Sequence, residues 1–394
     1  MQPHAPVVVV GGNLNALGVV RSLARAGIAA YALGTSRDCP TAWSRHCRFV
    51  PVARLHGEPL IEGLTRLARC LSQRPALLLT HDTSVDTVSA HRPVLEPLYH
   101  IDLPAAPIVA ALSDKLAFQT LAEREGFAVP RSRAVRGTQD LDRITELTPP
   151  MILKPAEKAW VLGSGVERAL RAETVPEARS HAVRMLAKAP AIIVQEWIPG
   201  EDSDIYFTLF LADGTGAPAA LFTGRKLRCW PEGVGSTAVC AAAPECAATL
   251  GLQTRQFLAR VPYRGLGSLE FKRHARTGQF LIVEPTVGRT DWQEEIATLC
   301  GINLPALAHA QASGQRLPDA PAGQGTRPLA WRSEWGFRVP AELRRRLRLI
   351  DGYFRWNDPL PALYHYAYTR GAGRLWRRAR RWIQPATQQL PRVH

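Results

Sequence analysis

The chain has 394 residues, which is long enough for two or three domains with substantial cores. Its apolar fraction of 46% is that of an ordinary globular protein, and no apolar stretch approaches the length of a membrane-spanning helix. Seven cysteines are widely spaced and form no CxxC pair. This spacing argues against a disulfide framework or a zinc site and indicates a reducing cytoplasm.

The net charge of +15 is spread unevenly along the chain. Residues 338–394 hold 13 arginines and no lysine against three acidic residues, so this segment carries +10 and the first 337 residues carry only +5. The basic character therefore belongs mainly to the C-terminal tail and not to the fold as a whole.

Residues 7–33 predict a strand, a glycine turn, a helix and a second strand. The opening run VVVV is typical of a buried parallel strand. The glycines that follow do not match GxGxxG, and no acidic residue ends the second strand, so a dinucleotide site is only weakly indicated. Residues 76–80 predict a further buried strand with Asp82 at its carboxyl end. Doubly wound sheets place ligands there, although an aspartate also caps a helix at this position.

Two lysines and a glycine loop occupy positions that suit an anionic ligand. Lys115 falls in the first turn of a helix, where the helix dipole disfavours a cation unless an anion binds nearby; a solvated lysine is the alternative. Lys154 ends the short strand PMILKP and is expected to point into the cleft that the sheet borders. A loop able to approach phosphates with its backbone follows at Gly163, Ser164 and Gly165.

Two further segments carry binding signals. Residues 192–206, IIVQEWIPGEDSDIY, resemble a segment on which adenine stacks while backbone groups read its edge. The stretch FTGRKLRCWPEGVGST supplies Arg225, Lys226 and Arg228. On a regular strand Lys226 and Arg228 face one way and Arg225 the other, so at most two of them can bind one carboxylate or phosphate. A solvated edge strand protected by basic residues is the alternative.

Residues 263–291 predict two strands joined by a turn at Arg276, Thr277 and Gly278, in which Gly278 is able to adopt a positive φ. With the turn centred on Thr277, Glu270 lies directly opposite Glu284. Like charges facing each other destabilise a ladder, so a cation is expected between them, and Mg²⁺ suits carboxylate ligands best. The alternatives are a register off by one and two carboxylates solvated on an exposed face.

The order of these motifs resembles the ATP-grasp superfamily over roughly residues 7–310. It looks most like the carboxylate–amine ligase branch, which includes D-aspartate ligase and is similar to the halves of carbamoyl-phosphate synthetase. The resemblance implies an α/β and α+β fold. A Rossmann-like pre-ATP-grasp domain would cover 1–110, and a two-subdomain ATP-grasp domain would cover 111–310, with the smaller lid part at 111–200 and the metal and substrate part at 201–310. A linker and a basic, aromatic, helical C-terminal extension would occupy 311–394.

The resemblance also implies roles for individual residues. Lys115 and Lys154 would contact the phosphates of ATP, and Glu270 and Glu284 would bind Mg²⁺, with Mn²⁺ as the alternative ion. Four consecutive residues would border the adenine, namely Gln195, Glu196, Trp197 and Ile198. The ribose would bind one of two acidic residues, Glu201 or Asp204.

One motif departs from the family pattern ExNxR. Here Thr286 stands where the family has Asn, and it offers one hydroxyl oxygen to a metal in place of a carbonyl. Arg289 is displaced by one residue, and the extra Gly288 would let it reach the cleft. Arg289 and the basic residues of 225–228 are then the candidates for stabilising an acyl phosphate and an acidic substrate.

The resemblance predicts a cytoplasmic, Mg²⁺-dependent ligase that uses ATP to activate a small carboxylate as an acyl phosphate for attack by an amine. A non-catalytic ATP-binding protein that docks to a membrane or partner through its basic tail is the alternative. A nicotinamide-dependent reductase is a third hypothesis. A homo-oligomer is compatible with each of them.

The C-terminal tail has a pattern of its own. Residues 372–394 place tryptophans on one helical face and arginines on the rest, which is typical of a helix lying on an anionic membrane surface. The expected location would then be peripheral, on the inner face of the membrane. Docking on the protein's own domain and binding to RNA are the alternatives, and nucleic acid is the weaker partner because no RNA-recognition motif accompanies the arginines.

Overall fold

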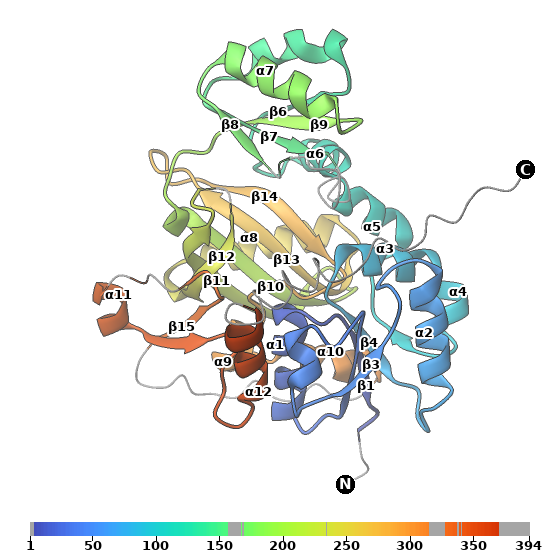
Figure 1. Ribbon diagram of the computed structural model, residues 1–394. Helices are drawn as coiled ribbons and strands as arrows, with labels where there is room; N and C mark the ends of the chain where they lie inside the picture. Colours follow the sequence, from blue (N-terminus) through green and yellow to red (C-terminus); the bar gives the residue numbers. More distant parts are fainter. Residues whose placement is uncertain are drawn as a thin grey trace, which may run out of the picture.

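The computed structural model describes residues 4–156, 167, 169–233, 235–314, 328–336, 339 and 341–369. These residues form three β-sheets with flanking helices. In Figure 1 a four-stranded sheet lies at the top, a seven-stranded sheet in the middle and a five-stranded sheet at the bottom. Within the described ranges, no helix combines the length and the apolarity that crossing a membrane requires.

The five-stranded sheet is parallel throughout, with strand order β3-β2-β1-β4-β5. Its strands are β1 (Val7–Val10), β2 (Ala30–Gly34), β3 (Arg48–Pro51), β4 (Ala76–Leu79) and β5 (His100–Ile101). The helices packed around it are α1 (Leu14–Arg25), α2 (Glu58–Ala68), α3 (Asp82–Ala90) and α4 (Arg92–Leu95). The strand, turn, helix and strand predicted for residues 7–33 are confirmed, and all four residues of β1 are fully buried.

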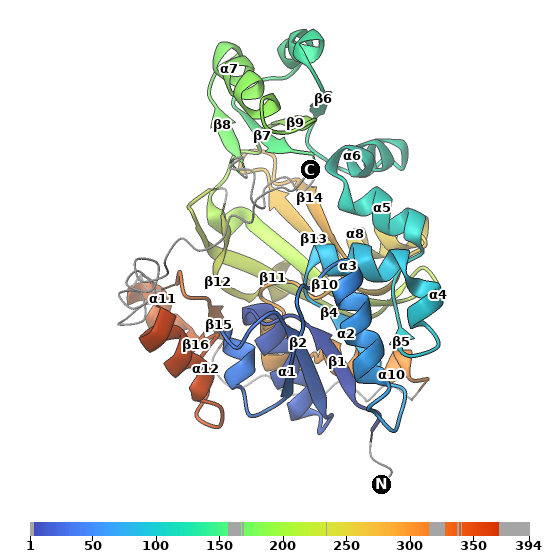
Figure 2. The same cartoon turned by 45° about the vertical axis from the view of Figure 1, so that its right-hand side comes forward.

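The four-stranded sheet is antiparallel, with order β6-β9-β7-β8. Its strands are β6 (Ser132–Val135), β7 (Met151–Pro155), β8 (Leu170–Ala172) and β9 (Ile192–Glu196). Helix α7 (Val175–Leu186) covers one face and contributes Ala178, Ala182 and Met185 to a separate small core. Helices α5 (Ala106–Ser113) and α6 (Lys115–Arg124) run up the side of the molecule toward this sheet (Figure 2).

The seven-stranded sheet has order β14-β13-β10-β11-β12-β15-β16 and is antiparallel except for its last pair. Its strands are β10 (Ile205–Asp213), β11 (Pro218–Trp230), β12 (Ser236–Ala242), β13 (Arg264–Arg273), β14 (Phe280–Val287), β15 (Leu329–Arg332) and β16 (Arg348–Asp351). The helices of this part are α8 (Ala247–Arg260), α9 (Glu295–Leu299), α10 (Leu304–Ala312), α11 (Ala341–Arg346) and α12 (Leu360–Leu363). The C-terminal extension therefore contributes two strands to the central sheet.

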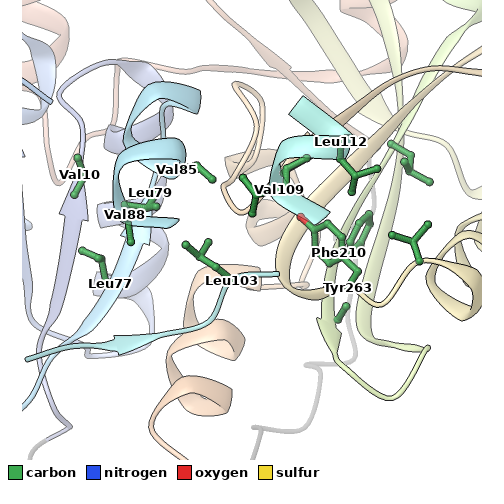
Figure 3. Packing of buried hydrophobic residues seen from close by; sticks show 14 of the residues in the cluster. Val10, Leu77, Leu79, Val85, Val88, Leu103, Val109, Leu112, Phe210 and Tyr263 are labelled. Atoms are coloured by element: carbon green, nitrogen blue, oxygen red, sulfur yellow. The ribbon is translucent and has the colours of Figure 1, made fainter. Parts of the chain in front are cut away.

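The five-stranded and seven-stranded sheets share a hydrophobic core. Leu79 and Val85 from the N-terminal part pack with Val109 of α5 and with Phe210 of β10 in one buried cluster (Figure 3). Because interiors pack densely, this shared core fixes how the two sheets sit against each other. The carboxyl ends of β1 and β4 are thereby held next to β14, the second strand of the glutamate hairpin.

The C-terminal extension is anchored on the N-terminal part by a buried ion pair. Arg21 Nε of α1 donates to Asp358 Oδ2 at 2.9 Å, and the side chains are 5% and 1% exposed. Ser44 Oγ donates to the same carboxylate oxygen at 2.8 Å, and the backbone N–H of Arg45 donates to Oδ1 at 3.0 Å. The carboxylate is thus fully engaged, which is the condition under which a charge is tolerated inside a protein.

Candidate nucleotide and metal site

A cavity of about 730 Å³ lies between the four-stranded and the seven-stranded sheets. We call it the larger cavity. Its wall includes residues from β7, β9, β11, β13 and β14, which are far apart in the sequence. Most of the sequence-predicted residues meet there, namely Lys115, Lys154, Gln195, Glu196, Trp197, Ile198, Lys226, Glu270, Glu284, Thr286 and Arg289.

The two glutamates of the hairpin face each other as expected, although the strands next to the turn are shifted by one residue and a β-bulge at Val283 restores the pairing. Gly278 adopts a φ of 72° in the turn, and β13 pairs with β14 so that Glu270 lies opposite Glu284. Thr286 lies on the same face of β14 as Glu284, because successive side chains of a strand alternate between faces. Two carboxylates and one hydroxyl thus border the larger cavity together.

The oxygen-only donor set of Glu270, Glu284 and Thr286 fits the ligand preference of Mg²⁺. The structure also supplies a protein cation, because Lys226 Nζ lies 2.5 Å from Glu270 Oε2. Burial by itself would lower the pKa of this lysine, but the carboxylate of Glu270 overrides it and raises the pKa above its usual value. Within the described residues, no group of three or more His, Cys, Asp or Glu side chains forms a metal cluster.

The two predicted lysines approach the larger cavity from its upper side. Lys154 ends β7, and its Nζ donates to Gln195 Oε1 of the neighbouring strand β9 at 3.4 Å. Lys115 begins α6, directly after Asp114, whose side chain caps the helix by accepting from the N–H of Ala117 at 2.7 Å. Lys115 is thus the first residue of a capped helix, and both lysines line the larger cavity.

The predicted adenine segment, residues 195–198, also lines the larger cavity. One of its four side chains, that of Glu196, is bonded to other parts of the protein. The carboxylate of Glu196 accepts a hydrogen bond from Arg131 at 3.1 Å and one from the backbone N–H of Thr148 at 2.9 Å. The ring of Trp197 lies between two cations, with the Arg171 guanidinium 4.6 Å and the Lys272 ammonium 4.7 Å from its centre. The apolar surface of the segment comes from Trp197 and Ile198.

The basic strand differs from its sequence-based prediction. A β-bulge at Leu227 shifts the register, so that Lys226 pairs with Cys240 while Arg228 pairs with Val239. The extra residue breaks the alternation that would have put Lys226 and Arg228 on one face. Of the three predicted basic residues, only Lys226 is found among the described residues of the larger cavity.

Arg225 belongs to a different environment from Lys226. Its guanidinium donates to the carbonyl of Ser203 and lies 5.1 Å from the ring centre of Tyr206. Neither Arg225 nor Arg228 is among the described residues that line the larger cavity, and their role at the substrate stays a prediction.

The ribose candidates are engaged in their own turn. Asp204 Oδ1 accepts from Arg273 Nη2 at 2.8 Å, and Asp204 Oδ2 accepts from the backbone N–H of Glu201 at 3.0 Å. Neither Glu201 nor Asp204 is among the described residues that line the larger cavity. The predicted phosphate loop, with Gly163, Ser164 and Gly165, lies outside the described residues.

Arg289 reaches the larger cavity and binds Asp82 of the N-terminal part. Its Nε donates to Asp82 Oδ1 at 2.6 Å and its Nη2 donates to Oδ2 at 3.2 Å. Gly288, with a φ of 64°, makes the turn that carries Arg289 off the end of β14. Asp82 is not the cap of α3, because the N-cap position is His81 and Asp82 is the first residue of the helix. Its place at the carboxyl end of a buried strand indicated a ligand position, and in the structure its carboxylate binds Arg289.

Sequence reasoning missed Lys272 and Trp292, both of which line the larger cavity. Lys272 lies two residues after Glu270 on β13, so strand alternation alone places it on the same face. Burial lowers the pKa of its ammonium, and nearby acidic groups oppose that effect only partly. No comparable pattern marked Trp292, which follows the hairpin.

No protein-family model matches the chain, and no curated protein matches it in sequence. Solved structures do match. N5-carboxyaminoimidazole synthetase from Staphylococcus aureus in complex with ADP has a TM-score of 0.63 and 14% identity, covering 84% of this chain and 82% of the other.

Two further structures represent other activities. The biotin carboxylase domain of 2-oxoglutarate carboxylase from Hydrogenobacter thermophilus, with MgADP, ADP and bicarbonate, has a TM-score of 0.59 and 17% identity, covering 79% of this chain and 71% of the other. Phosphoribosylamine–glycine ligase from Thermotoga maritima has a TM-score of 0.60 and 14% identity, covering 80% and 78%.

These neighbours are ATP-grasp proteins of the carboxylate–amine ligase type. The chain therefore has the ATP-grasp fold, and the resemblance seen in the sequence is confirmed at the level of the fold. Because the sequence identity to these structures is below one fifth, they show the fold alone. The activity is argued from this chain's own residues.

Proposed function

We propose that the protein is an ATP- and Mg²⁺-dependent ligase that activates a carboxylate as an acyl phosphate and joins it to an amine. The observation that carries the proposal is the meeting of two lysines, a strand with an apolar end and two facing glutamates around one cavity. The fold supports it, because two of the similar structures hold ADP and one of these also holds bicarbonate.

The phosphate end of the nucleotide would lie between Lys115, Lys154 and the glutamate hairpin. Mg²⁺, when bound, would supply charge neutralisation at the phosphate oxygens. Lys115 and Lys154, which also line the larger cavity, would add two ammonium groups. Phosphoryl transfer needs positioning and charge stabilisation more than covalent help, and these side chains provide both.

The reacting carboxylate would bind where Lys226 and Arg289 line the larger cavity. Lys226 is 5% exposed, and the Arg289 side chain is 13% exposed, so both charges act in a partly dry environment in which electrostatic interactions are strong. Arg289 keeps its charge, since the neighbouring Asp82 more than offsets the effect of burial and raises its pKa. The two cations suit the negative charge that an acyl phosphate carries.

The test is trapping of the acyl phosphate. The purified chain is incubated with Mg²⁺ and ATP, a panel of carboxylic acids that includes the common amino acids and bicarbonate, and hydroxylamine. Hydroxamate and ADP are then measured. We expect at least one acid to give both, and Glu284→Gln to lower the rate by about 10²-fold. Lys154→Ala should weaken ATP binding, whereas Lys188→Ala, at an exposed position away from the larger cavity, should not.

The second candidate is a nucleotide-binding protein without turnover. Thr286 in the place of Asn and the Lys226 ammonium against Glu270 favour it, because both weaken the metal site. Tight ATP binding with no ADP release for any acid or amine, and no loss on Glu284→Gln, would establish this candidate and reject the ligase.

The cytoplasmic location, the homo-oligomer and the membrane contact stay predictions. The membrane prediction rests on residues 372–394, which lie outside the described part of the chain.

A further inference from the structure

Large apolar side chains are exposed together where the short 3₁₀ helix η1 (Pro40–Trp43) packs on α12. They are Trp43 (43% exposed), Trp356 (91%), Leu360 (50%) and Leu363 (59%). We call this surface the apolar edge. The ring of Trp43 stacks on that of Tyr364, which follows Leu363, with the ring centres 5.5 Å apart. A single exposed apolar side chain is ordinary, but a group of them marks a surface that contacts another molecule.

Trp356 is presented by a turn that is anchored in the protein interior. The turn is closed by Arg355 and Asp358, because the backbone N–H of Asp358 donates to the Arg355 carbonyl at 3.0 Å. The buried Asp358 carboxylate holds one arm of the turn through Arg21, and the Arg355 guanidinium holds the other by pairing with Glu295 at 2.6 Å. The indole is therefore held out in water by a fixed backbone, which lowers the entropy cost of binding through it.

The charge around the apolar edge is mainly positive. Arg37 and Arg45 are exposed near Trp43, whose Nε1 donates to the Arg37 carbonyl at 3.0 Å. Asp38 is an exposed acid in the same segment. The chain that continues from this edge, residues 370–394, adds seven arginines and no acidic residue. An anionic partner suits this surface, whereas a second copy of the same basic surface would be repelled.

More arginines belong to the same C-terminal extension. Helix α11 and strand β16 expose Arg344, Arg345, Arg346 and Arg348, and Arg346 pairs with the exposed Glu342. Figure 2 shows α11, β16 and α12 on one side of the molecule. Both Figure 1 and Figure 2 place the four-stranded sheet at the far end from α12. A partner bound at the apolar edge would therefore leave that sheet free.

We propose that the apolar edge docks on an anionic lipid bilayer, with its four apolar side chains in the headgroup boundary and the neighbouring arginines on lipid phosphates. Tryptophan suits this boundary because its ring is apolar and its N–H is polar. The exposed leucines favour lipid over nucleic acid, whose bases stack on aromatic rings and not on aliphatic side chains. The inference is independent of the proposed ligase function, and it adds a surface of the folded protein to the contact predicted for the tail.

Sedimentation with vesicles tests the proposal. The full-length chain is mixed with vesicles of phosphatidylcholine alone, or of phosphatidylcholine and phosphatidylglycerol in equal parts. We expect binding to the mixed vesicles that weakens as salt is added. Leu363→Ser should lower the affinity by about three- to tenfold, because the leucine no longer leaves water on binding. Leu252→Ser is the matched control, since Leu252 is about equally exposed and lies on α8.

Fluorescence reports whether Trp356 enters the bilayer. Lipids brominated on their acyl chains quench tryptophans that reach them. Trp356→Phe keeps an aromatic side chain, so this variant should still bind the mixed vesicles while the quenched fraction of its fluorescence falls. Trp335→Phe is the control, because Trp335 is also exposed but stacks on Trp230, outside the apolar edge. Thermal unfolding of each variant, expected to match the wild type, shows that it is folded.

The outcomes are distinct. Absence of binding to both kinds of vesicle would overturn the proposal. Binding that is unchanged in Leu363→Ser, with quenching unchanged in Trp356→Phe, would assign the contact to the tail alone and would overturn it too. A wild-type dimer in light scattering that Leu363→Ser converts to a monomer would make the edge an interface between copies. None of these measurements uses a nucleotide, so their result is separate from that of the hydroxamate test.

Discussion

Lys226 Nζ lies 2.5 Å from Glu270 Oε2, so one of the two facing glutamates of the hairpin already has a cation. Lys226 is 5% exposed, and the hairpin places Glu284 directly opposite Glu270. The ladder therefore tolerates two like charges without a metal, because the ammonium offsets one of them. A divalent ion at this site would have to compete with Lys226 for Glu270.

Lys226→Met should make this competition visible. The variant leaves Glu270 without its partner, so we expect the free energy of unfolding without metal to fall by about 1–3 kcal/mol. Mg²⁺ alone should then raise the melting temperature more in the variant than in the wild type. Thermal unfolding with and without Mg²⁺ measures both effects, and Lys188→Met, at an exposed position, is the control. An equal Mg²⁺ effect in both proteins would show that Lys226 does not compete for the site.

The pair Asp82–Arg289 joins the N-terminal part to the end of the hairpin, and its energy is measurable. The side chains are 32% and 13% exposed, and the carboxylate accepts from two guanidinium nitrogens. A double-mutant cycle of Asp82→Ala and Arg289→Ala, followed by denaturant unfolding, should give a coupling energy of about 0.5–3 kcal/mol. The pair Glu342–Arg346, with side chains 72% and 75% exposed, should give no more than about 0.5 kcal/mol. Equal coupling energies would mean that the pair Asp82–Arg289 contributes no more than an exposed surface pair.

The local parts of the site were predictable from the sequence. Glu270 lies opposite Glu284 as predicted, but the turn alone does not set this pairing, because next to the turn Phe271 pairs with Ile282 and a β-bulge at Val283 shifts the register by one residue before Glu270. The position of Lys154 was predictable because it ends an apolar strand, and that of Lys115 because it begins a helix. These inferences needed only the neighbours of each residue in the chain.

The parts that were missed depend on long-range packing or on irregular backbone. A bulge at Leu227 separates Lys226 from Arg228, and nothing in FTGRKLR marks it. The partner of Arg289 lies 207 residues away in the sequence, and that of Arg21 lies 337 away. Pairings at such separations follow from how the sheets pack and not from local pattern. The two strands that the C-terminal extension adds to the central sheet were missed for the same reason.

Gly288 should be intolerant of a side chain. Its φ is 64°, and a Cβ there would lie 2.6 Å from Leu103 Cδ2 and 3.1 Å from Val85 Cγ1 in the shared core. Gly288→Ala is expected to cost about 1–3 kcal/mol of stability and to move Arg289 away from Asp82.

Gly278→Ala is the matched control for Gly288→Ala. Gly278 has a φ of 72°, and an added Cβ would meet nothing within 4 Å, so it carries the backbone strain without the clash. Denaturant unfolding gives the loss of stability in each variant. The loss in Gly288→Ala minus the loss in Gly278→Ala is the cost of the steric clash. Equal losses would mean that the core around Leu103 yields to the methyl group.

Glu294 should make stability depend on pH. Its side chain lies in the core beside α1, Oε2 has no hydrogen-bond partner among the described residues, and Thr298 donates to Oε1 at 3.4 Å. Burial, together with the neighbouring Glu295, raises its pKa to about 8. The unfolded chain has a glutamate pKa of about 4.3. Between these two values the folded state holds a proton that the unfolded state has lost, so the free energy of unfolding falls as the pH rises.

Glu294→Gln removes this dependence, because the amide resembles the protonated acid and does not titrate. Relative to the wild type, we expect the variant to gain stability steadily from pH 5 to pH 8, reaching a gain of about 1 kcal/mol or more at the upper end. Denaturant unfolding across this range measures the difference. Glu62→Gln, at an exposed position of α2, should show no trend with pH. A constant difference between Glu294→Gln and the wild type would mean that the carboxyl group is ionised in the folded protein throughout, with a partner that stabilises its charge.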